Sequence, residues 1–394
     1  MASNFRGERE TGRDNFPYAA TRVKARKSTL IPKAQYEKFL VMDLPSITRF
    51  IGETEYAKEI NELSTKYSGL DLVEMATYEN LARNFHEVLE FCRGNLKLVV
   101  ERYLTIWDTW NIKTILRGKS YQASSQEILD DLVPAGTFSR EDLRKMVAAE
   151  DIDALLEHLK GTEFYKHVKD ARTAGGDVDL MKLENHLEKD YYADLLTIST
   201  GTGWVNKIIL RFFREKIDLV NLKTLFKLKY AEMEPEFISS YLLPGGYEMN
   251  MSHLKQLAGT AEMVKCTKCN ELIPALATKC PKCGEEFEEN AGAAAGPPNF
   301  DRFLNELKSY RFWPAIKDAA EAAAESGTLN MVMSALDAYH FKNAAKFGKL
   351  YPLSLLPFLD YFIWKKIEVD NIRIICRGKQ AGLSEDLIRS MLIT

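Results

Sequence analysis

The chain has 394 residues, of which 46% are hydrophobic and 28% are charged. This composition is typical of a globular protein, and at about 150 residues per domain the length predicts two or three domains. Lys and Arg total 53 and Asp and Glu total 56, so the formal net charge is −3. Because dedicated nucleic-acid binders carry a large basic excess, this balance disfavours that class of protein.

The N-terminal segment has no apolar stretch that could act as a signal peptide, and we expect residues 1–17 to form a flexible tail. Residues 18–32 are basic and compatible with a helix. Their cations fit either a solvated helix or contact with an acidic partner or lipid headgroups. The most apolar window, residues 350–364, includes two prolines and an aspartate. It is shorter than the roughly 20 apolar residues that a membrane-spanning helix needs.

An internal repeat is the most informative feature of the sequence. The stretch NIKTILRGKSYQASSQEILDDLVPAG from Asn111 matches NLKTLFKLKYAEMEPEFISSYLLPGG from Asn221 without a gap, with eight of 26 positions identical. A third copy, NIRIICRGKQAGLSEDLI, begins at Asn371. Self-similarity of this kind predicts a chain built from similar structural units. We expect repeat one at residues 18–137, repeat two at 138–247 and repeat three at 248–394.

Each repeat is predicted to be helical. Capping boxes occur at Ser124 with Glu127 and at Ser139 with Asp142, directly before apolar periodic sequence. Leu, Ile and Phe recur at three- and four-residue spacing in residues 79–116, 184–228 and 331–376. Alternating apolar and polar stretches are scarce, so the sequence predicts an all-α fold of three similar helical repeats.

Glycine flanked by cations occurs at Gly118 and Gly378, which predicts helix C-termini with glycine in the left-handed cap position. The cations near these predicted ends form the set Arg117, Lys119, Lys227, Lys229, Arg377 and Lys379. One interpretation is that they are solvated helix caps. The other is that three related helices converge, so that their basic ends line a common mouth that binds a partner.

Four of the six cysteines follow the pattern Cys266-x2-Cys269-x10-Cys280-x2-Cys283. Two such pairs of thiolates complete a tetrahedron around Zn²⁺, and four protein ligands leave no open position, which predicts a structural metal. A disulfide pair or a redox site is the alternative. The other two, Cys92 and Cys376, stand alone in apolar sequence, which is typical of a reducing compartment such as the cytoplasm.

The position of the cysteine segment follows from two sets of spacings. The repeat asparagines are separated by 110 and then 150 residues, and the aromatic residues Tyr56, Tyr165 and Trp313 by 109 and then 148. Both sets show an excess of about 40 residues in the third repeat. We therefore expect a zinc ribbon at residues 262–290 and a linker at 291–298. Four Lys against six Glu within the ribbon disfavour contact with phosphates.

Motifs of common enzyme classes are missing from the sequence. It contains neither a phosphate-binding loop nor G-x-G-x-x-G, and the six histidines are scattered without a zinc-protease spacing. We expect no catalytic residues. Trp107, Trp110 and Trp364, beside the repeat asparagines, are predicted to be core residues.

The chain resembles the C subunit of archaeal A-type ATP synthases and the homologous d subunit of vacuolar ATPases. The resemblance rests on YAATRVKARKSTL from Tyr18, on the three helical copies and on the Asn-[Ile/Leu]-[Lys/Arg] signatures followed by Arg-Gly-Lys. It covers nearly the whole chain from about residue 18, and the cysteine segment departs from the common pattern of the family.

The resemblance implies a funnel-like, non-catalytic rotor adaptor made of three similar helical units. Such a protein lies at the cytoplasmic face of the cell membrane as a peripheral component. It connects the central-stalk subunits to the membrane proteolipid ring and transmits torque, so that proton or sodium transport is coupled to ATP synthesis or hydrolysis. The six cations at the helix ends are then candidates for partner contacts.

Two other hypotheses remain open at this point. One is a non-enzymatic helical-repeat scaffold whose zinc ribbon acts in transcription or RNA handling, against which the acidic ribbon argues. The other is an enzyme with an unrecognised site between repeats.

Overall fold

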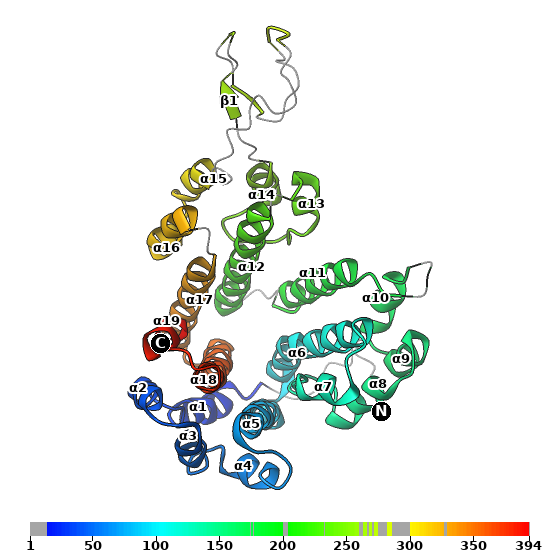
Figure 1. Cartoon of the computed structure of the whole chain (residues 1–394), viewed down its shortest axis with the longest axis vertical. Coiled ribbons are helices and arrows are strands. Elements are labelled where there is room, and N and C mark those ends of the chain that lie inside the picture. Colours follow the sequence, from blue (N-terminus) through cyan, green and yellow to red (C-terminus); the bar gives the residue numbers. More distant parts are fainter. Residues whose placement is uncertain are drawn as a thin grey trace. The chain divides into compact units, whose positions relative to one another are not determined.

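Helices form where apolar side chains recur every three or four residues, and the described part of the chain is mainly helical (Figure 1), as the all-α prediction requires. The structure is a computed structural model that describes residues 14–173, 175, 177–199, 204–231, 233–259, 263–265, 268–269, 272–274, 282–285, 300–326 and 329–393.

The chain divides into two compact units. Unit 1 contains residues 1–212 and 341–394, and unit 2 contains residues 213–340. Two helices are divided between the units, because each begins in one unit and ends in the other. These are α12 (Trp204–Tyr230) and α17 (Asn330–Leu350). The other helices of unit 1 are α1 (Phe16–Lys27), α2 (Lys33–Val41), α3 (Leu44–Ile51), α4 (Ala57–Leu63), α5 (Gly69–Phe91), α6 (Gly94–Ser120), α7 (Ser125–Asp130), α8 (Arg140–Ala148), α9 (Ile152–Leu159), α10 (Phe164–Asp170), α11 (Leu180–Ile198), α18 (Leu356–Gln380) and α19 (Glu385–Met391).

One hydrophobic cluster among the described residues of unit 1 brings together both ends of the chain. Phe39 of α2 and Ile47 of α3 are buried with Ile372 and Cys376 of α18 and Ile388 of α19. The blue helices α1 and α2 therefore lie beside the red and orange helices α19 and α18 (Figure 1). We call this group of α2–α5, α18 and α19 the terminal cluster.

A second cluster of unit 1, the central cluster, is built from α6 to α11 alone. Its buried side chains include Ile112 and Leu116 on α6, Leu143 on α8, Leu155 on α9 and Leu183 on α11. Both predicted capping boxes lie here and are confirmed, because the Ser124 and Ser139 hydroxyls accept from main-chain N–H groups at the starts of α7 and α8.

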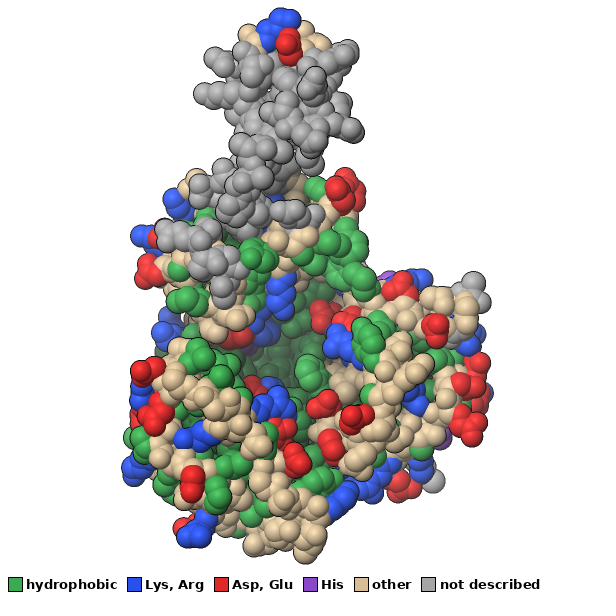
Figure 2. Space-filling model, viewed as in Figure 1, with side chains coloured by type: hydrophobic (Ala, Val, Ile, Leu, Met, Phe, Trp, Pro, Cys, Tyr) green, Lys and Arg blue, Asp and Glu red, His purple; other side chains and the backbone are tan. Residues whose placement is uncertain are grey.

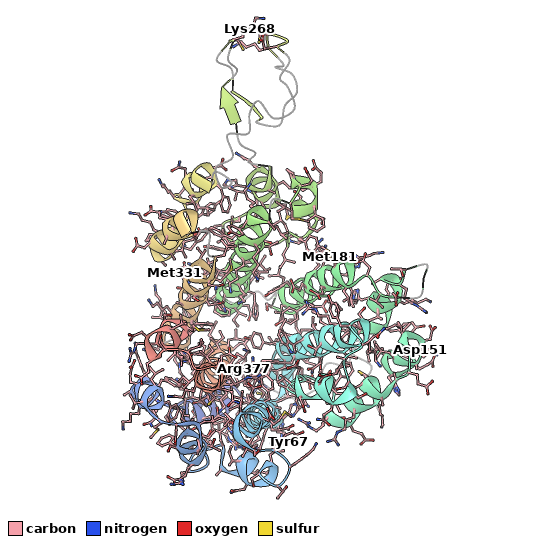
Figure 3. The ribbon with its side chains drawn as sticks, viewed as in Figure 1. Tyr67, Asp151, Met181, Lys268, Met331 and Arg377 are labelled. Carbon is pink, nitrogen blue, oxygen red and sulfur yellow. The ribbon has the colours of Figure 1, made fainter. Side chains whose placement is uncertain are left out.

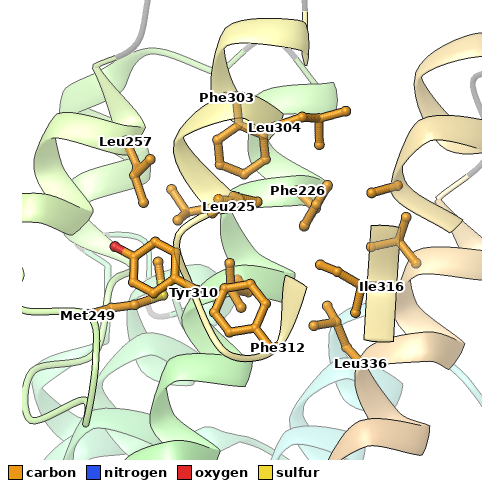
Figure 4. Packing of buried hydrophobic residues seen from close by; sticks show 14 of the residues in the cluster. Leu225, Phe226, Met249, Leu257, Phe303, Leu304, Tyr310, Phe312, Ile316 and Leu336 are labelled. Atoms are coloured by element: carbon orange, nitrogen blue, oxygen red, sulfur yellow. The ribbon is translucent and has the colours of Figure 1, made fainter. Parts of the chain in front are cut away.

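Unit 2 packs around α12. Its other helices are α13 (Pro235–Ser240), α14 (Met251–Ala258), α15 (Phe300–Leu307) and α16 (Trp313–Ser326). Phe226 of α12 packs edge to face against Phe303 of α15 with ring centroids 5.0 Å apart, next to Leu257, Ile316 and Leu336 (Figure 4). Two short antiparallel strands, β1 (Met263–Lys265) and β2 (Leu272–Pro274), occur in the expected ribbon segment.

A buried asparagine on each of three long helices makes the same pair of hydrogen bonds. Asn111 of α6 donates to the Val133 carbonyl at 2.7 Å and accepts from the Val133 N–H at 2.9 Å. Asn221 of α12 makes both bonds with Leu243, and Asn371 of α18 makes both with Ile393, each partner lying 22 residues further along the chain. Each long helix is followed by a short one (α7, α13 or α19), and the asparagine thereby fixes the residues after the short helix to the long helix. The repeat boundaries remain a prediction.

Two local predictions are wrong. Gly118 and Gly378 do not cap helices but lie inside α6 and α18, where a Cβ atom would come within 2.4 Å of Ile128 and 2.6 Å of Ile388, respectively. These glycines therefore serve close packing rather than a left-handed turn. Trp110 is 50% exposed and is not a core residue, because it lies on the outer side of α6.

Replacing Asn111 with alanine should destabilise the protein more than replacing Asn371. Val133 is fully buried, so its N–H and carbonyl would both lose their partners, at a cost of about 3 kcal/mol. Ile393 is half-buried, and water can replace the lost bonds, so we expect a cost of about 1 kcal/mol. Urea denaturation of both variants measures the difference, and equal losses would contradict the assigned role of burial.

Candidate functional site

The C-terminal turns of α6, α12 and α18 carry the six cations predicted to contact a partner, and three of these are lysines held inside the protein. The ammonium of Lys119 donates to the carbonyls of Val147, at 3.0 Å, and Ala149 at the end of α8. Lys229 donates to Leu257 at 3.1 Å, and Lys379 to Leu40 at 2.7 Å. Each lysine thus satisfies carbonyls at the C-terminus of a neighbouring helix, where a positive charge is favourable.

The other three cations lie on the outside. The side chain of Arg117 is 49% exposed and pairs with Glu184 of α11. That of Arg377, labelled in Figure 3, is 55% exposed and pairs with Glu74 of α5. Lys227 is exposed near the end of α12. The predicted set therefore contains two groups with different surroundings, and whether either group contacts a partner remains a prediction.

A further cation lies two residues after each repeat asparagine; it belongs to the repeat signature, but it was not predicted to make a contact. Lys113 pairs with Glu188 of α11 at 2.8 Å, and Lys223 pairs with Asp337 of α17 at 2.5 Å. The equivalent Arg373 of α18 lies 3.6 Å from the centre of the Tyr78 ring. A Lys or Arg occupies this position in all three copies, and this recurrence was the sequence signal that could have indicated a contact residue.

A buried aspartate three residues before Asn111 of α6 organises the loop between α7 and α8. The Asp108 carboxylate accepts hydrogen bonds from the Thr137 and Phe138 N–H groups at 2.7–3.0 Å and from the Thr137 hydroxyl at 2.8 Å. A Cβ atom at Gly136 would lie 2.2 Å from Asp108 Oδ1, so only glycine lets the loop approach. Burial raises the pKa of Asp108 to about 6, although the hydrogen bonds act in the opposite direction.

Asp218 of α12 binds the following loop in the same way. Its carboxylate accepts from the N–H groups of Tyr247, Glu248 and Met249, and a Cβ atom at Gly246 would lie 2.0 Å from its Oδ1. Burial likewise raises the pKa of Asp218 to about 6. The sequence contained this signal as an Asp three residues before an Asn and a Gly 28 residues after that Asp.

The third copy has a glutamate at this position and uses it differently. Glu368 of α18 accepts from the Ile31 N–H and from the Tyr56 hydroxyl, and it forms a buried ion pair with Lys365 at 2.6 Å. Two of these three partners, Ile31 and Tyr56, thus come from the N-terminal part of the chain. Nothing in the local sequence around Glu368 indicates these contacts.

The basic N-terminal helix α1 uses two of its cations within unit 1. Arg26 pairs with Glu87 of α5, and Lys27 pairs with Asp360 of α18 at 2.5 Å. These internal ion pairs match neither interpretation of the stretch, the solvated helix or the contact with a partner or lipid, for Arg26 and Lys27.

The predicted zinc site is only partly within the described residues. Cys269 and Cys283 each lie at a turn, whereas Cys266 and Cys280 fall outside the described residues. Lys268, labelled at the tip of this segment in Figure 3, pairs with Glu285 at 2.8 Å, which brings the two turns close together. Gly284 has a φ of +74°, as predicted for the residue after the second cysteine pair.

A groove of about 880 Å³ between α4, α5, α7 and α8 is lined mainly by charged side chains, and some of these form ion pairs with one another. Arg83 pairs with Glu59 at 2.5 Å, and Arg140 pairs with Glu79 across the groove. Cations and acids are also intermixed over the visible face of unit 1 (Figure 2).

Burial raises the pKa of the Cys92 and Cys376 thiols to about 12, so neither is a reactive thiolate at neutral pH.

Comparison with known proteins assigns the chain to a protein family. The family model described as ATP synthase (C/AC39) subunit matches residues 19–267 and 260–391. The chain belongs to this family. The C subunit of the A-type ATP synthase of Methanosarcina acetivorans is 34% identical over 388 residues, which cover 98% of this chain and 95% of the relative. The same subunit of Archaeoglobus fulgidus is 33% identical (95% and 96% covered) and that of Haloferax volcanii 29% (97% and 99%).

Membership of the ATP synthase C/AC39 family means that this chain is a non-catalytic subunit and that it works within an ATPase complex. The charged groove of unit 1 is therefore not an active site. Among the described residues, no helix is long and apolar enough to cross a membrane.

The pH dependence of stability tests the environment of Asp108. Its pKa is raised from about 3.9 in the unfolded chain to about 6, so the folded state binds this proton more tightly and the resulting stabilisation is lost as the pH rises through 6. Relative to Asp108→Asn, the wild type should gain about 1 kcal/mol of unfolding free energy between about pH 7.5 and pH 5. An unchanged difference across this range would show that the hydrogen bonds outweigh burial.

Proposed function

We propose that this chain is the central-stalk rotor adaptor of an A-type or V-type ATP synthase. It connects the central-stalk subunits to the membrane proteolipid ring and transmits torque, which couples proton or sodium transport to ATP synthesis or hydrolysis. It associates peripherally with the cytoplasmic face of the membrane through protein contacts. Family membership over nearly the whole chain supports this proposal.

The bracing at the ends of α6, α12 and α18 is the observation that carries the mechanical part of the proposal. Each helix is fixed to its following loop by an asparagine and to the end of another helix by a lysine. A rotor adaptor must resist torsion, and close-packed, hydrogen-bonded elements transmit strain rather than absorb it. Load applied at one helix end would pass directly to its neighbour.

The two groups of cations would then have different roles. Arg117, Lys227 and Arg377 are exposed, so we propose that they contact acidic groups of the stalk or ring. Lys119, Lys229 and Lys379 already donate to carbonyls within the protein and would support these contacts without making them.

We also propose that Cys266, Cys269, Cys280 and Cys283 hold one structural Zn²⁺. The described residues fit this group because the turns of Cys269 and Cys283 are joined by the pair of Lys268 with Glu285, and Gly284 has the required left-handed conformation. Bound zinc would stabilise the segment, since its four thiolate ligands leave no position for substrate or water.

Charge reversal tests the partner contacts. We expect Arg117→Glu with Arg377→Glu to weaken binding to purified central-stalk subunits and solubilised proteolipid ring about tenfold at low salt, because exposed ionic contacts would become repulsive. Arg144→Glu, at an exposed arginine of α8, is the matched control. In the swap Arg117→Glu with Glu184→Arg the internal pair is restored, so recovery of binding by this swap would show that Arg117 only supports the fold.

Metal analysis tests the zinc site. Full-length protein purified without chelator should contain about one zinc per chain, and Cys269→Ser with Cys283→Ser should lose it. Cys92→Ala and Cys376→Ala, at the buried cysteines of unit 1, should retain the metal. Metal-free protein whose four ribbon cysteines are recovered as two disulfides would contradict the proposal.

A further inference from the structure

Lys229 lies beside the two helices of unit 2 that flank the cysteine-bearing segment in the chain. This segment, residues 259–299, follows the last residue of α14, Ala258, and precedes the first residue of α15, Phe300. Lys229 is the second-last residue of α12, around which α14 and α15 pack. We call α14 and α15 the two stems of the segment.

The Lys229 side chain touches both stems. Its ammonium donates to the carbonyls of Leu257 at 3.1 Å and Ala258 at 3.4 Å, the last two residues of the first stem. The same ammonium lies 5.6 Å from the centre of the Phe303 ring in the second stem. A cation at this distance from an aromatic face is attracted by it. Phe303 in turn packs on Phe226, three residues before Lys229 on α12.

The equivalent lysines show what is special about this position. Lys119 and Lys379 donate to carbonyls at the ends of α8 and α2, but there the chain enters the next helix within a few residues, at Ile152 and Leu44. At Lys229 the two flanking helices α14 and α15 are instead separated in sequence by the 41 residues 259–299. The same contact is therefore made at a helix that precedes a long insertion rather than a short connection.

Electrostatics agree with an enclosed position between the stems. Burial lowers the pKa of Lys229 to about 8, and Glu306 of α15 partly opposes this by favouring the ammonium. His253, in the first turn of α14, is hydrogen-bonded to the Tyr310 hydroxyl.

We propose that Lys229 is a clamp that holds both stems of the cysteine-bearing segment to α12. The clamp adds to the apolar packing of α14 and α15 on α12, independently of whether the segment binds zinc and of the partners that the whole chain binds. Lys229 is a positioning residue, and the zinc ligands lie elsewhere in the sequence.

Hydrogen exchange of the full chain tests the clamp, with Lys229→Met against the matched control Lys119→Met. We expect Lys229→Met to raise amide exchange at the end of α14 and in α15 at least about tenfold, with no change at the end of α8. Lys119→Met should do the reverse. Lys229→Arg keeps a donor and a cation and should retain most of the protection. Zinc content should stay at the wild-type value in all three variants, which separates this test from that of the metal site.

Two outcomes would overturn the proposal. One is protection of α14 and α15 within about twofold of wild type in Lys229→Met, and the other is an equal loss there in Lys119→Met. If Lys229→Met unfolds all of unit 2, Phe303→Leu removes the ring contact with Lys229 together with the packing on Phe226, and Phe226→Leu, which removes the packing alone, is its control. Phe303→Leu should raise exchange in α15 more than Phe226→Leu does while the end of α14 stays protected, and equal exchange in the two variants would contradict the clamp.

Discussion

The architecture depends on the buried asparagine side chain that binds both main-chain groups of one residue 22 positions later. A carboxamide is suited to this because it offers a donor and an acceptor side by side, and a buried peptide group needs both. Asn111, Asn221 and Asn371 fix the end of the following short helix to the middle of the long one. The aspartates and lysines of the same turns can reach their partners only because this distance is set.

The two kinds of cation at each helix end follow from helix geometry. Positions 117 and 119 are two residues apart, which at 3.6 residues per turn is about 200° around the axis. One side chain therefore points toward a neighbouring helix end when the other points outward. The same holds at positions 227 and 229 and at 377 and 379, so a basic pair that looks uniform in sequence contains one internal and one exposed member.

Local features could be predicted from the sequence, and contacts over long distances could not. Helical periodicity and the caps at Ser124 and Ser139 depend on residues close together in the chain, and the place of the cysteine segment followed from the repeat spacing. The role of Gly118 was mispredicted because a glycine is needed there for the close approach of Ile128, and this contact forms only after the chain turns back. Ile31 and Tyr56, which both donate to Glu368, lie more than 300 residues from it, and a single sequence gives no sign of these contacts. The sequence identified the six cations as candidate contact residues, but it did not show which of them already bind groups within the protein.

The terminal cluster has a consequence for biosynthesis. Its N-terminal helices α2–α5 share a core with α18 and α19, so Phe39 and Ile47 are separated in sequence from Ile372 and Cys376 by most of the chain. A ribosome releases the N-terminal part first. The helices of the central cluster are complete long before α18 emerges, whereas α2–α5 must wait with an exposed apolar face until translation ends. The first helices synthesised are thus among the last to be buried, and during that interval they are a natural substrate for chaperones.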